Sequence, residues 1–384
     1  MKNMILFNKP CLTGKEFDYI HEAIGSGQIS GNGQFTKQCQ SFLEKSTSAK
    51  KCLLTTSCTD ALEMSAILAR IEPGDEVIMP SFTFPSTANA FILRGAKIVF
   101  IDSRPDHPGV DERQIEAAVT ERTKAIVPVH YAGVACDMDV IAAVATRHAL
   151  FVIEDAAQAI DSFFIDATKK RIPLGSIGEF GTFSFHETKN IQAGEGGALL
   201  INRPEHIERS EIVWEKGTNR AAFWRGDVDK YGWVDIGSSF LPSELTAAFL
   251  YAQLEALRTT QDRRIDIWNQ YNDGLQSIFQ QAKLRAPYVP SFATNNGHMF
   301  YAVCESERIR ADLIAFLRKK DIYSVFHYQS LHAAPYFQAL HDGRDLPWAD
   351  AYSSRLLRLP MHPELTNSQI ARVVSGITDF FNSP

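Results

Sequence analysis

The sequence predicts an α/β fold, with a large domain built on a mostly parallel sheet flanked by helices and a smaller α+β domain after it. Three observations support this prediction. Over the first two-thirds of the chain, short apolar runs alternate with helical patterns, as in right-handed βαβ units. From about residue 242 the pattern changes to a long helical stretch followed by mixed segments. At 384 residues the chain exceeds one typical core, so we expect domains at residues 1–242 and 243–384.

The expected elements follow in chain order. The large domain is expected to contain a helix over 61–69, strands over 76–80, 96–101, 125–130 and 150–153, helices over 87–93 and 141–148, a β-like run at 181–183 and a return strand at 198–201. The second domain is expected to contain a long connecting helix over 243–275, an extended stretch at 298–304, a helix over 308–320, a strand near 324–326 and a C-terminal helix. Ligands collect at the carboxyl ends of parallel strands. Polar residues that follow these strands are therefore candidate site residues.

Composition argues against several classes of function. The net charge is −6 and no basic block is present, so we expect no nucleic-acid partner. No apolar run is long enough to span a membrane, and the first ten residues, with Lys2 and Lys9, lack the apolar core of a signal peptide. The six cysteines show no C-x-x-C pairing, which predicts free thiols, a cytoplasmic protein and no zinc site.

Lys189 and Asp155 each follow an apolar run that we expect to be a buried strand. Residues 151–153 end at the acid, and residues 181–183 lead into Ser184, with the lysine five positions later. A desolvated lysine amine can lose its proton and attack a carbonyl. Pyridoxal phosphate needs a lysine for its aldehyde, a carboxylate for its ring nitrogen and donors for its phosphate. The alternatives are a surface lysine and an aspartate that caps a helix; the two matching strand ends favour the cofactor.

Small polar residues open the helix expected after residue 56. Ser57, Cys58 and Thr59 would offer free backbone N–H groups and the helix dipole to a phosphate, together with Ser184 if the sheet brings them close. The simpler alternative for Ser57 is a helix cap. At such a site the pKa of the Cys58 thiol is expected to be lowered, but no base accompanies it and we do not expect a catalytic thiol.

Two further residues are candidates for the cofactor ring. Gln158 lies three residues after Asp155, would face the same side of a first helical turn and could bond the ring hydroxyl; a solvated helix residue is the alternative. Phe82 and Phe84 follow a strand, where aromatic rings pack in the core or stack on a planar cofactor. We expect one to be core and choose Phe84 as the stacking face.

Two other motifs, for a zinc-binding helix and for a dinucleotide-binding loop, are incomplete in this sequence. The segment 186–190 begins like a zincin helix but has Asn190 where the second histidine must be. Gly25–Gly27 and Gly31–Gly33 lack the third glycine of a dinucleotide fingerprint, and no strong strand precedes them.

Taken together, these residues resemble the DegT/StrS-type sugar-nucleotide aminotransferases, a branch of the fold-type I pyridoxal-phosphate enzymes. The resemblance runs from Ser30 to Pro360 and is most specific in 152–158 and 183–190; segments 128–136, 215–220 and 235–239 add to it. Relatives that dehydrate sugars have a histidine in place of the lysine, so Lys189 favours transamination. The resemblance implies a homodimer with active sites at the subunit interface, L-glutamate as amino donor and a dTDP-sugar as acceptor.

The resemblance also implies roles for individual residues. Lys189 would bind the cofactor aldehyde and move protons, and Asp155 would pair with the ring nitrogen. The implied ring-hydroxyl contact is Gln158, and the implied phosphate contacts are Ser57, Cys58, Thr59 and Ser184. Many relatives use an asparagine of the other subunit at the phosphate; here that position is Ser239, and Asn219 is the alternative. The implied substrate contacts are Gly31, Arg220 and His332. The alternatives left open are another nucleotide sugar, 3-oxo or UDP-linked, and a non-catalytic regulator that binds the cofactor.

Overall fold

The computed structural model describes residues 4–382, so Lys2 lies outside the described part. A seven-stranded sheet forms the centre of the molecule, in the order β1-β9-β8-β5-β4-β2-β3. Only β9 runs antiparallel to its neighbours. This arrangement confirms the predicted α/β fold with a mostly parallel sheet. Its strands are β1 (Lys51–Thr55), β2 (Glu76–Pro80), β3 (Lys97–Ile101), β4 (Thr123–Ile126), β5 (Phe151–Asp155), β8 (Phe180–Ser184) and β9 (Gly197–Ile201).

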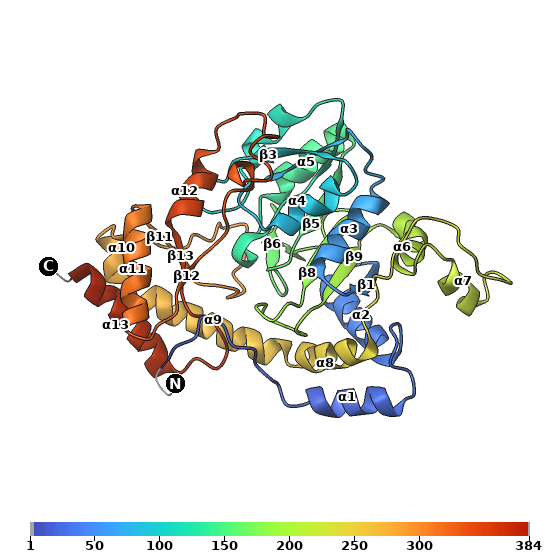
Figure 1. The fold of residues 1–384 in the computed structure, drawn as a ribbon, viewed down its shortest axis with the longest axis horizontal. Helices are drawn as coiled ribbons and strands as arrows, with labels where there is room; N and C mark the ends of the chain where they lie inside the picture. The colour runs from blue at the N-terminus through green and yellow to red at the C-terminus, as the bar shows by residue number, and fades with distance from the viewer. Residues whose placement is uncertain (1–3, 383–384) are drawn as a thin grey trace.

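Helices cover both faces of the sheet (Figure 1). The helices of this part are α1 (Glu16–Gly25), α2 (Gln34–Thr47), α3 (Cys58–Leu68), α4 (Pro85–Ile92), α5 (Met138–His148), α6 (Ile207–Trp214), α7 (Arg220–Arg225) and α8 (Glu244–Glu255). Alternate strand residues face opposite layers, as the strand period requires. In β5, Val152 packs with α5, whereas Ile153 packs with the layer that contains α3 and α4. Both faces are therefore apolar, which leaves the strand ends for chemistry.

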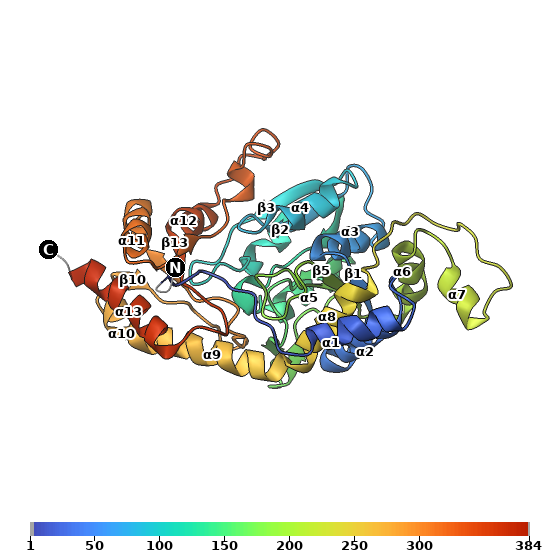
Figure 2. The same cartoon turned by 60° about the horizontal axis from the view of Figure 1, so that its bottom comes forward.

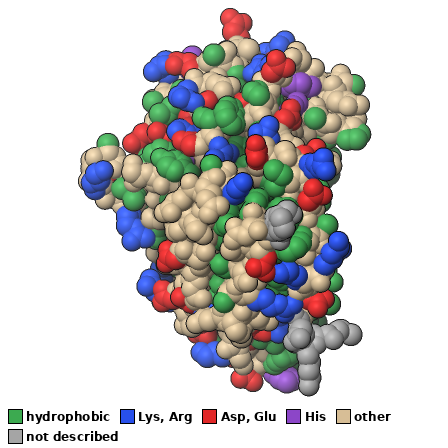
Figure 3. Space-filling view, turned by 90° about the vertical axis from the view of Figure 1, so that its left-hand side faces the viewer, with side chains coloured by type: hydrophobic (Ala, Val, Ile, Leu, Met, Phe, Trp, Pro, Cys, Tyr) green, Lys and Arg blue, Asp and Glu red, His purple; other side chains and the backbone are tan. Residues whose placement is uncertain are grey.

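The last third of the chain builds a second, four-stranded sheet in the order β10-β11-β13-β12. The elements of this part are α9 (Leu257–Gly274), α10 (Gln276–Gln280), β10 (Leu284–Arg285), β11 (Tyr301–Cys304), α11 (Glu307–Lys319), β12 (Val325–Phe326), α12 (Pro347–Arg355), β13 (Leu356–Arg358) and α13 (Asn367–Asn382). A small hairpin, β6 (Phe163–Ile165) and β7 (Arg171–Pro173), stands apart. On the face that carries the C-terminal helices, basic and acidic side chains are interspersed (Figure 3).

The long helix expected over 243–275 is two helices. Ser243 caps α8 by accepting a hydrogen bond from Thr246 N, and Ala256 leaves helical geometry with φ −91° and ψ 6°. From this break α9 continues toward the C-terminal sheet, so the pair runs along one side of the molecule (Figure 2). Because α8 packs on α1 and α2 of the first part, the division of the chain at residue 243 stays a prediction.

An arm formed by residues 215–240 projects from the body beside α6 (Figures 1 and 2). It contains α7 and is tied at its base by bridges between Glu215 and Ser239 and between Thr218 and Trp233. Several of its large apolar side chains are exposed to solvent: Trp233 is 85% exposed and Trp224 is 68% exposed. Within residues 4–382, no helix has the length and hydropathy needed to cross a membrane.

Candidate active site

A cavity of about 800 Å³ lies at the carboxyl ends of the parallel strands, where the C-terminal sheet closes it on the other side. It brings together eight of the residues that the sequence singled out: Ser57, Cys58, Thr59, Phe84, Asp155, Gln158, Ser184 and Lys189. They come from segments that are up to 132 positions apart, between the first and the last of these residues. Their convergence follows from the parallel sheet, because β1, β2, β5 and β8 all end at this edge.

Lys189 follows β8 in an irregular segment whose backbone is fixed by a hydrogen bond from Lys189 N to His186 O, 2.8 Å. Its side chain lines the cavity and is only partly exposed, so it is not an ordinary surface lysine. Burial lowers the pKa of the amine, while the nearby Cys58 and Asp155 oppose that shift. The lowered pKa makes the neutral, nucleophilic amine more available near neutral pH.

Asp155 ends β5 and is 6% exposed. Its Oδ2 accepts a hydrogen bond from the hydroxyl of Thr87, 2.7 Å, and that hydroxyl is 2.9 Å from the hydroxyl of Thr83. Its Oδ1 accepts a bond from Ala157 N, 3.2 Å. The residues after β5 form turns and not a helix, so the alternative of a helix-capping aspartate is wrong. The carboxylate is instead held in a fixed orientation at the cavity wall.

The neighbouring acid, Glu154, anchors the same strand end from the opposite face. It is fully buried and accepts backbone N–H bonds from Gly175, Ile177 and Gly178 at 2.7–2.8 Å. Its Oε2 also lies 2.9 Å from Nε2 of the buried His130. Because successive strand residues point to opposite faces, the rigidly held Glu154 fixes the direction in which Asp155 points.

The N-terminus of α3 forms an anion cradle. Ser57 caps this helix, its Oγ accepting from Asp60 N at 3.1 Å. The N–H groups of Cys58 and Thr59 begin the helix and so have no partner within it, which leaves them for an anion. Gly197 of β9 pairs with both Thr55 and Ser184, and so brings β8 beside the helix. A Cβ at Gly197 would lie 2.4 Å from Cys58 N, so only glycine permits this close approach.

The expectation of a lowered pKa at Cys58 is wrong. Burial raises the pKa of this thiol well above its usual range, and the Asp155 carboxylate adds to the effect. The helix N-terminus does not compensate for the lost hydration. Cys58 therefore lines the cradle as a neutral thiol.

Gln158 is buried, so the alternative of a solvated helix residue is wrong. Its Oε1 accepts from Ala132 N, 2.6 Å, and its Nε2 donates to the hydroxyl of Tyr328, 3.0 Å. Phe82 is fully buried, as expected for the core, whereas Phe84 is 55% exposed at the cavity rim with its ring 5.9 Å from that of Tyr328. Stacking of Phe84 on the cofactor stays a prediction.

Five predicted residues do not line this cavity in the single chain. Ser239, Asn219 and Arg220 belong to the arm, where Asn219 Oδ1 accepts from Gly232 N and Arg220 lies over the Trp224 ring. Gly31 lies against Leu241 and Pro242. His332 Nδ1 is 2.7 Å from Ser81 Oγ, and its other nitrogen is 3.5 Å from Asp350. Their predicted contacts would need a second subunit or a large bound substrate.

Sequence reasoning missed the contribution of the C-terminal part to the cavity. His298, His327, Tyr328 and Arg358 line it, all from segments with no motif of their own. The available signal was Arg358 between Leu357 and Leu359 in an apolar stretch, where a charge is costly unless it has a ligand or partner.

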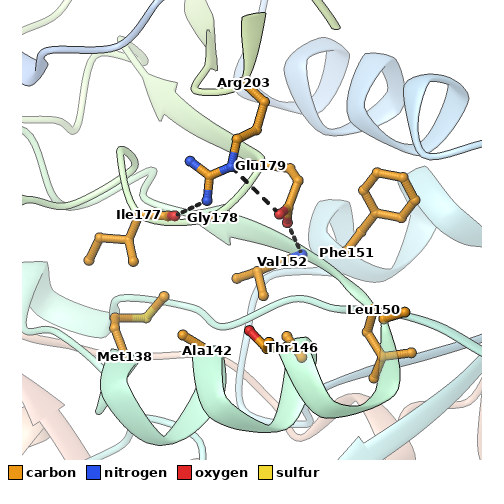
Figure 4. Close-up of a pocket in the computed structure, with 12 residues that line it drawn as sticks. Met138, Ala142, Thr146, Leu150, Phe151, Val152, Ile177, Gly178, Glu179 and Arg203 are labelled. Carbon is orange, nitrogen blue, oxygen red and sulfur yellow. Dashed lines mark hydrogen bonds and ion pairs between the residues drawn. The ribbon is translucent and has the colours of Figure 1, made fainter. Parts of the chain in front are cut away.

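A second hollow, of about 330 Å³, lies between α5, β5 and residues 177–179 (Figure 4). Its charged groups already have partners: Glu179 accepts from Val152 N at 2.7 Å, and Arg203 pairs with Glu179 and with Ile177 O. Apart from Thr146, mainly apolar side chains line the rest of it. This hollow therefore offers no reactive group, and the chemistry belongs to the cavity at the strand ends.

Comparisons with protein families, with sequences and with solved structures all find similar proteins that span nearly the whole chain. Residues 10–378 match the DegT/DnrJ/EryC1/StrS aminotransferase family. The spore coat polysaccharide biosynthesis protein SpsC of Bacillus subtilis (strain 168) is 34% identical over 388 residues, covering 97% of this chain and 96% of that protein. The aminotransferase TlmJ from Streptoalloteichus hindustanus has a TM-score of 0.89 at 26% identity, covering 98% of this chain and 99% of that chain. Spr1654 from Streptococcus pneumoniae, solved in a PLP form, has a TM-score of 0.88 at 25% identity, covering 98% of both chains.

Proposed function

The chain belongs to the DegT/DnrJ/EryC1/StrS aminotransferase family, and from that premise we propose that it moves the amino group of L-glutamate to the 4-oxo group of dTDP-4-oxo-6-deoxy-D-glucose. The products are dTDP-4-amino-4,6-dideoxy-D-galactose and 2-oxoglutarate, and the sugar would enter a surface polysaccharide such as enterobacterial common antigen. The enzyme is an aminotransferase with pyridoxal phosphate as its cofactor. The choice of sugar is supported by the resemblance of segments 128–136, 215–220 and 235–239 to dTDP-4-amino-4,6-dideoxygalactose transaminase.

One observation carries the catalytic part of the proposal. A lysine with a lowered pKa and a hydrogen-bonded aspartate line the same cavity as a free helix N-terminus. These groups fit the three parts of the cofactor: Lys189 its aldehyde, Asp155 its ring nitrogen, and the α3 cradle with Ser184 its phosphate. When bound, the cofactor supplies the electron sink that stabilises negative charge at the donor's α carbon.

The side chains of this chain would supply the proton transfers. The Nζ of Lys189, whose pKa is lowered by burial, would remove the proton from the α carbon of glutamate. The carboxylate of Asp155, held by Thr87 and Ala157 N, would keep the ring nitrogen protonated. Gln158, with its amide oriented by Ala132 N and Tyr328, would face the ring hydroxyl.

We propose that the working enzyme is a homodimer and that the arm of residues 215–240 packs on the second copy. Exposed aromatic side chains on a projecting segment, Trp224, Tyr231 and Trp233 above all, favour burial against a partner. The same arm carries Asn219, Arg220 and Ser239, which is consistent with a contribution from one subunit to the other subunit's cavity.

The proposal is tested with a panel of oxo nucleotide sugars, L-glutamate as donor and product detection by mass spectrometry. The 4-oxo dTDP-sugar should show the highest kcat/KM, because pocket shape sets specificity in such enzymes. A higher kcat/KM for a 3-oxo or a UDP-linked sugar would replace the proposed acceptor. If glutamate leaves the visible absorbance of the bound cofactor unchanged, the chain would instead be a non-catalytic binder.

A further inference from the structure

Asn190, the residue after Lys189, is buried, and hydrogen bonds fix its side-chain amide. Its Nδ2 donates to Asn296 O at 3.0 Å and to Gln261 Oε1 at 2.8 Å. A backbone carbonyl can only accept, so this end of the amide is the nitrogen and the other end is the oxygen. That oxygen, Oδ1, lies 2.8 Å from Nδ1 of His298. Because an amide oxygen can only accept, Nδ1 of His298 carries a proton.

His298 is neutral, so this is the only proton on its ring. The side chain is 7% exposed. Burial lowers its pKa well below the usual range, and the cations Lys189, Arg264 and Arg358 add to the effect. With the proton on Nδ1, Nε2 is a bare nitrogen that can only accept a hydrogen bond. Nδ1 is turned to the protein interior, which leaves Nε2, across the ring, for the cavity that the side chain lines. Within residues 4–382, no hydrogen bond reaches this Nε2.

The backbone at His298 is held as firmly as the ring. Its N–H donates to Asn296 Oδ1 at 2.9 Å, and its carbonyl accepts from Nη2 of the buried Arg264 at 2.6 Å. Arg264 lies in α9, and its Nε also donates to Gly297 O at 3.0 Å. Asn296 in turn donates from Nδ2 to Gln158 O at 2.9 Å, at the strand-end side of the cavity. Nε2 of His298 is therefore an acceptor in a fixed place.

The chemistry of this nitrogen limits what it can receive. Ionised carboxylate and phosphate oxygens have no proton to donate, so neither the carboxylates of glutamate nor the diphosphate of a nucleotide sugar suits it. Lys189 and His298 are close enough for the lysine to depress the pKa of the imidazole, so the ligand atom lies near the carbon that exchanges its nitrogen. In the proposed acceptor sugar that carbon is at position 4, between position 3 with a hydroxyl and position 5 with the methyl group. The 3-hydroxyl is the proton donor beside the reacting carbon.

We propose that Nε2 of His298 accepts a hydrogen bond from the hydroxyl that flanks the reacting carbon of the acceptor sugar, and that Asn190 is the positioning residue that fixes the tautomer of His298. The inference rests on the proposed function, in which that group is the 3-hydroxyl. It names a contact by which the enzyme distinguishes an oxo sugar with this hydroxyl from one without it. The contact serves the sugar and not glutamate, which has no hydroxyl.

The test compares the 4-oxo dTDP-sugar with the same nucleotide sugar lacking the 3-hydroxyl, on the cofactor-loaded enzyme. Wild type should lose roughly 10- to 100-fold in kcat/KM when the hydroxyl is removed, because a buried acceptor is then left without a donor. His298→Phe should lose a similar factor with the full sugar and should hardly distinguish the two sugars. His298→Gln, whose amide oxygen can accept, should recover part of the loss. His21→Phe, on the exposed surface of α1, is the control and should behave as wild type.

Two measurements separate this role from a merely structural one. In His298→Phe, the half-saturating glutamate concentration, followed by the loss of visible absorbance, should change much less than kcat/KM for the sugar. The ring-nitrogen NMR signals of His298 should show an Nδ1–H tautomer in wild type that is lost in Asn190→Ala. The Asn190→Ala enzyme should also lose roughly 3- to 10-fold in kcat/KM for the full sugar.

The inference is overturned if wild type uses the two sugars equally well, if the His298→Phe loss falls equally on glutamate and on the sugar, or if the NMR signals place the proton on Nε2. The first and the last of these results need no variant, so they decide the matter even where a substitution disturbs folding. A wild type that does not respond to glutamate, or that aminates no 4-oxo dTDP-sugar, would refute the proposed function itself. The NMR result does not depend on that outcome, and the hydroxyl comparison would then use the oxo sugar that the enzyme accepts.

Discussion

The hydroxyl of Thr87 donates a 2.7 Å hydrogen bond to Oδ2 of Asp155, across 68 positions of sequence. Thr87 lies in α4, which follows β2, and β4 separates β2 from β5 in the sheet, so one strand end orients the acid of a strand two positions away. Replacing Thr87 with Val removes this bond and should lower kcat/KM about 3- to 10-fold, because the carboxylate loses one of its two neutral donors. Steady-state kinetics of the purified variant would check this. Thr87→Ser keeps the hydroxyl and should retain wild-type rates; equal rates for Val and Thr would contradict the assigned role.

The close approach of β9 to α3 makes Gly197 sensitive to any side chain. Gly197→Ala would place a Cβ 2.4 Å from Cys58 N and from the carbonyl carbon of Ser57. We expect a loss of about 1–3 kcal/mol in the free energy of unfolding and weaker binding of pyridoxal phosphate. Denaturant unfolding and a cofactor titration measure the two effects. Gly25→Ala, at a position with open space, is the control; a Gly197→Ala enzyme with unchanged cofactor affinity would argue against the cradle.

Buried histidines should make the protein sensitive to acid. Burial lowers the pKa of His107 to about 4, and its Nδ1 accepts a bond from Gly109 N. Between its unfolded pKa near 6.5 and about 4, the unfolded chain binds the proton and the folded one does not, so the free energy of unfolding falls as pH falls. The fall is about 1.4 kcal/mol per pH unit for this histidine.

Urea unfolding at neutral and mildly acid pH would measure that dependence. His107→Asn keeps an acceptor near the position of Nδ1 and should reduce the loss between pH 7 and pH 5 by about 2 kcal/mol. His21→Asn, on the exposed surface of α1, controls for removing a histidine as such. An unchanged pH dependence in His107→Asn would contradict the inferred burial effect.

The arm should contribute to assembly. Trp233→Ser removes an aromatic side chain that is 85% exposed in the single chain. If the arm packs on a second copy, the dimer dissociation constant should rise roughly 30-fold or more, as for a central interface aromatic. Sedimentation over a concentration series measures this. Leu93→Ser, an exposed apolar side chain outside the arm, should leave the dimer intact; if both variants assemble as wild type does, the arm is not the interface.

The site residues at the strand ends could be predicted from the rule that parallel sheets bind ligands at the carboxyl ends of their strands. Lys189, Asp155 and Ser57 each follow an apolar run, and parallel strands deliver such residues to one edge. The residues on the opposite wall of the cavity could not be predicted from the sequence. His327 and Arg358 reach the cavity only through the pairing of β12 with β13, which are short strands without an alternating pattern long enough to detect.

Local errors have equally physical causes. No proline or glycine lies near Ala256, so the sequence pattern of residues 243–275 predicts one continuous helix although the helix breaks there. The pKa of Cys58 was expected to follow the helix dipole, but the loss of hydration at the cavity wall outweighs that dipole. The residues after Asp155 form turns and not a helix, and Asp155 supports the first turn by accepting a hydrogen bond from Ala157 N.

The most direct test of the account is to find the lysine that holds the cofactor. The enzyme is loaded with pyridoxal phosphate, treated with borohydride to make the attachment permanent, digested and sequenced by mass spectrometry. The account predicts the cofactor on Lys189 alone, with no labelled peptide from Lys189→Ala. Label on any other lysine, or steady turnover by Lys189→Ala, would contradict it.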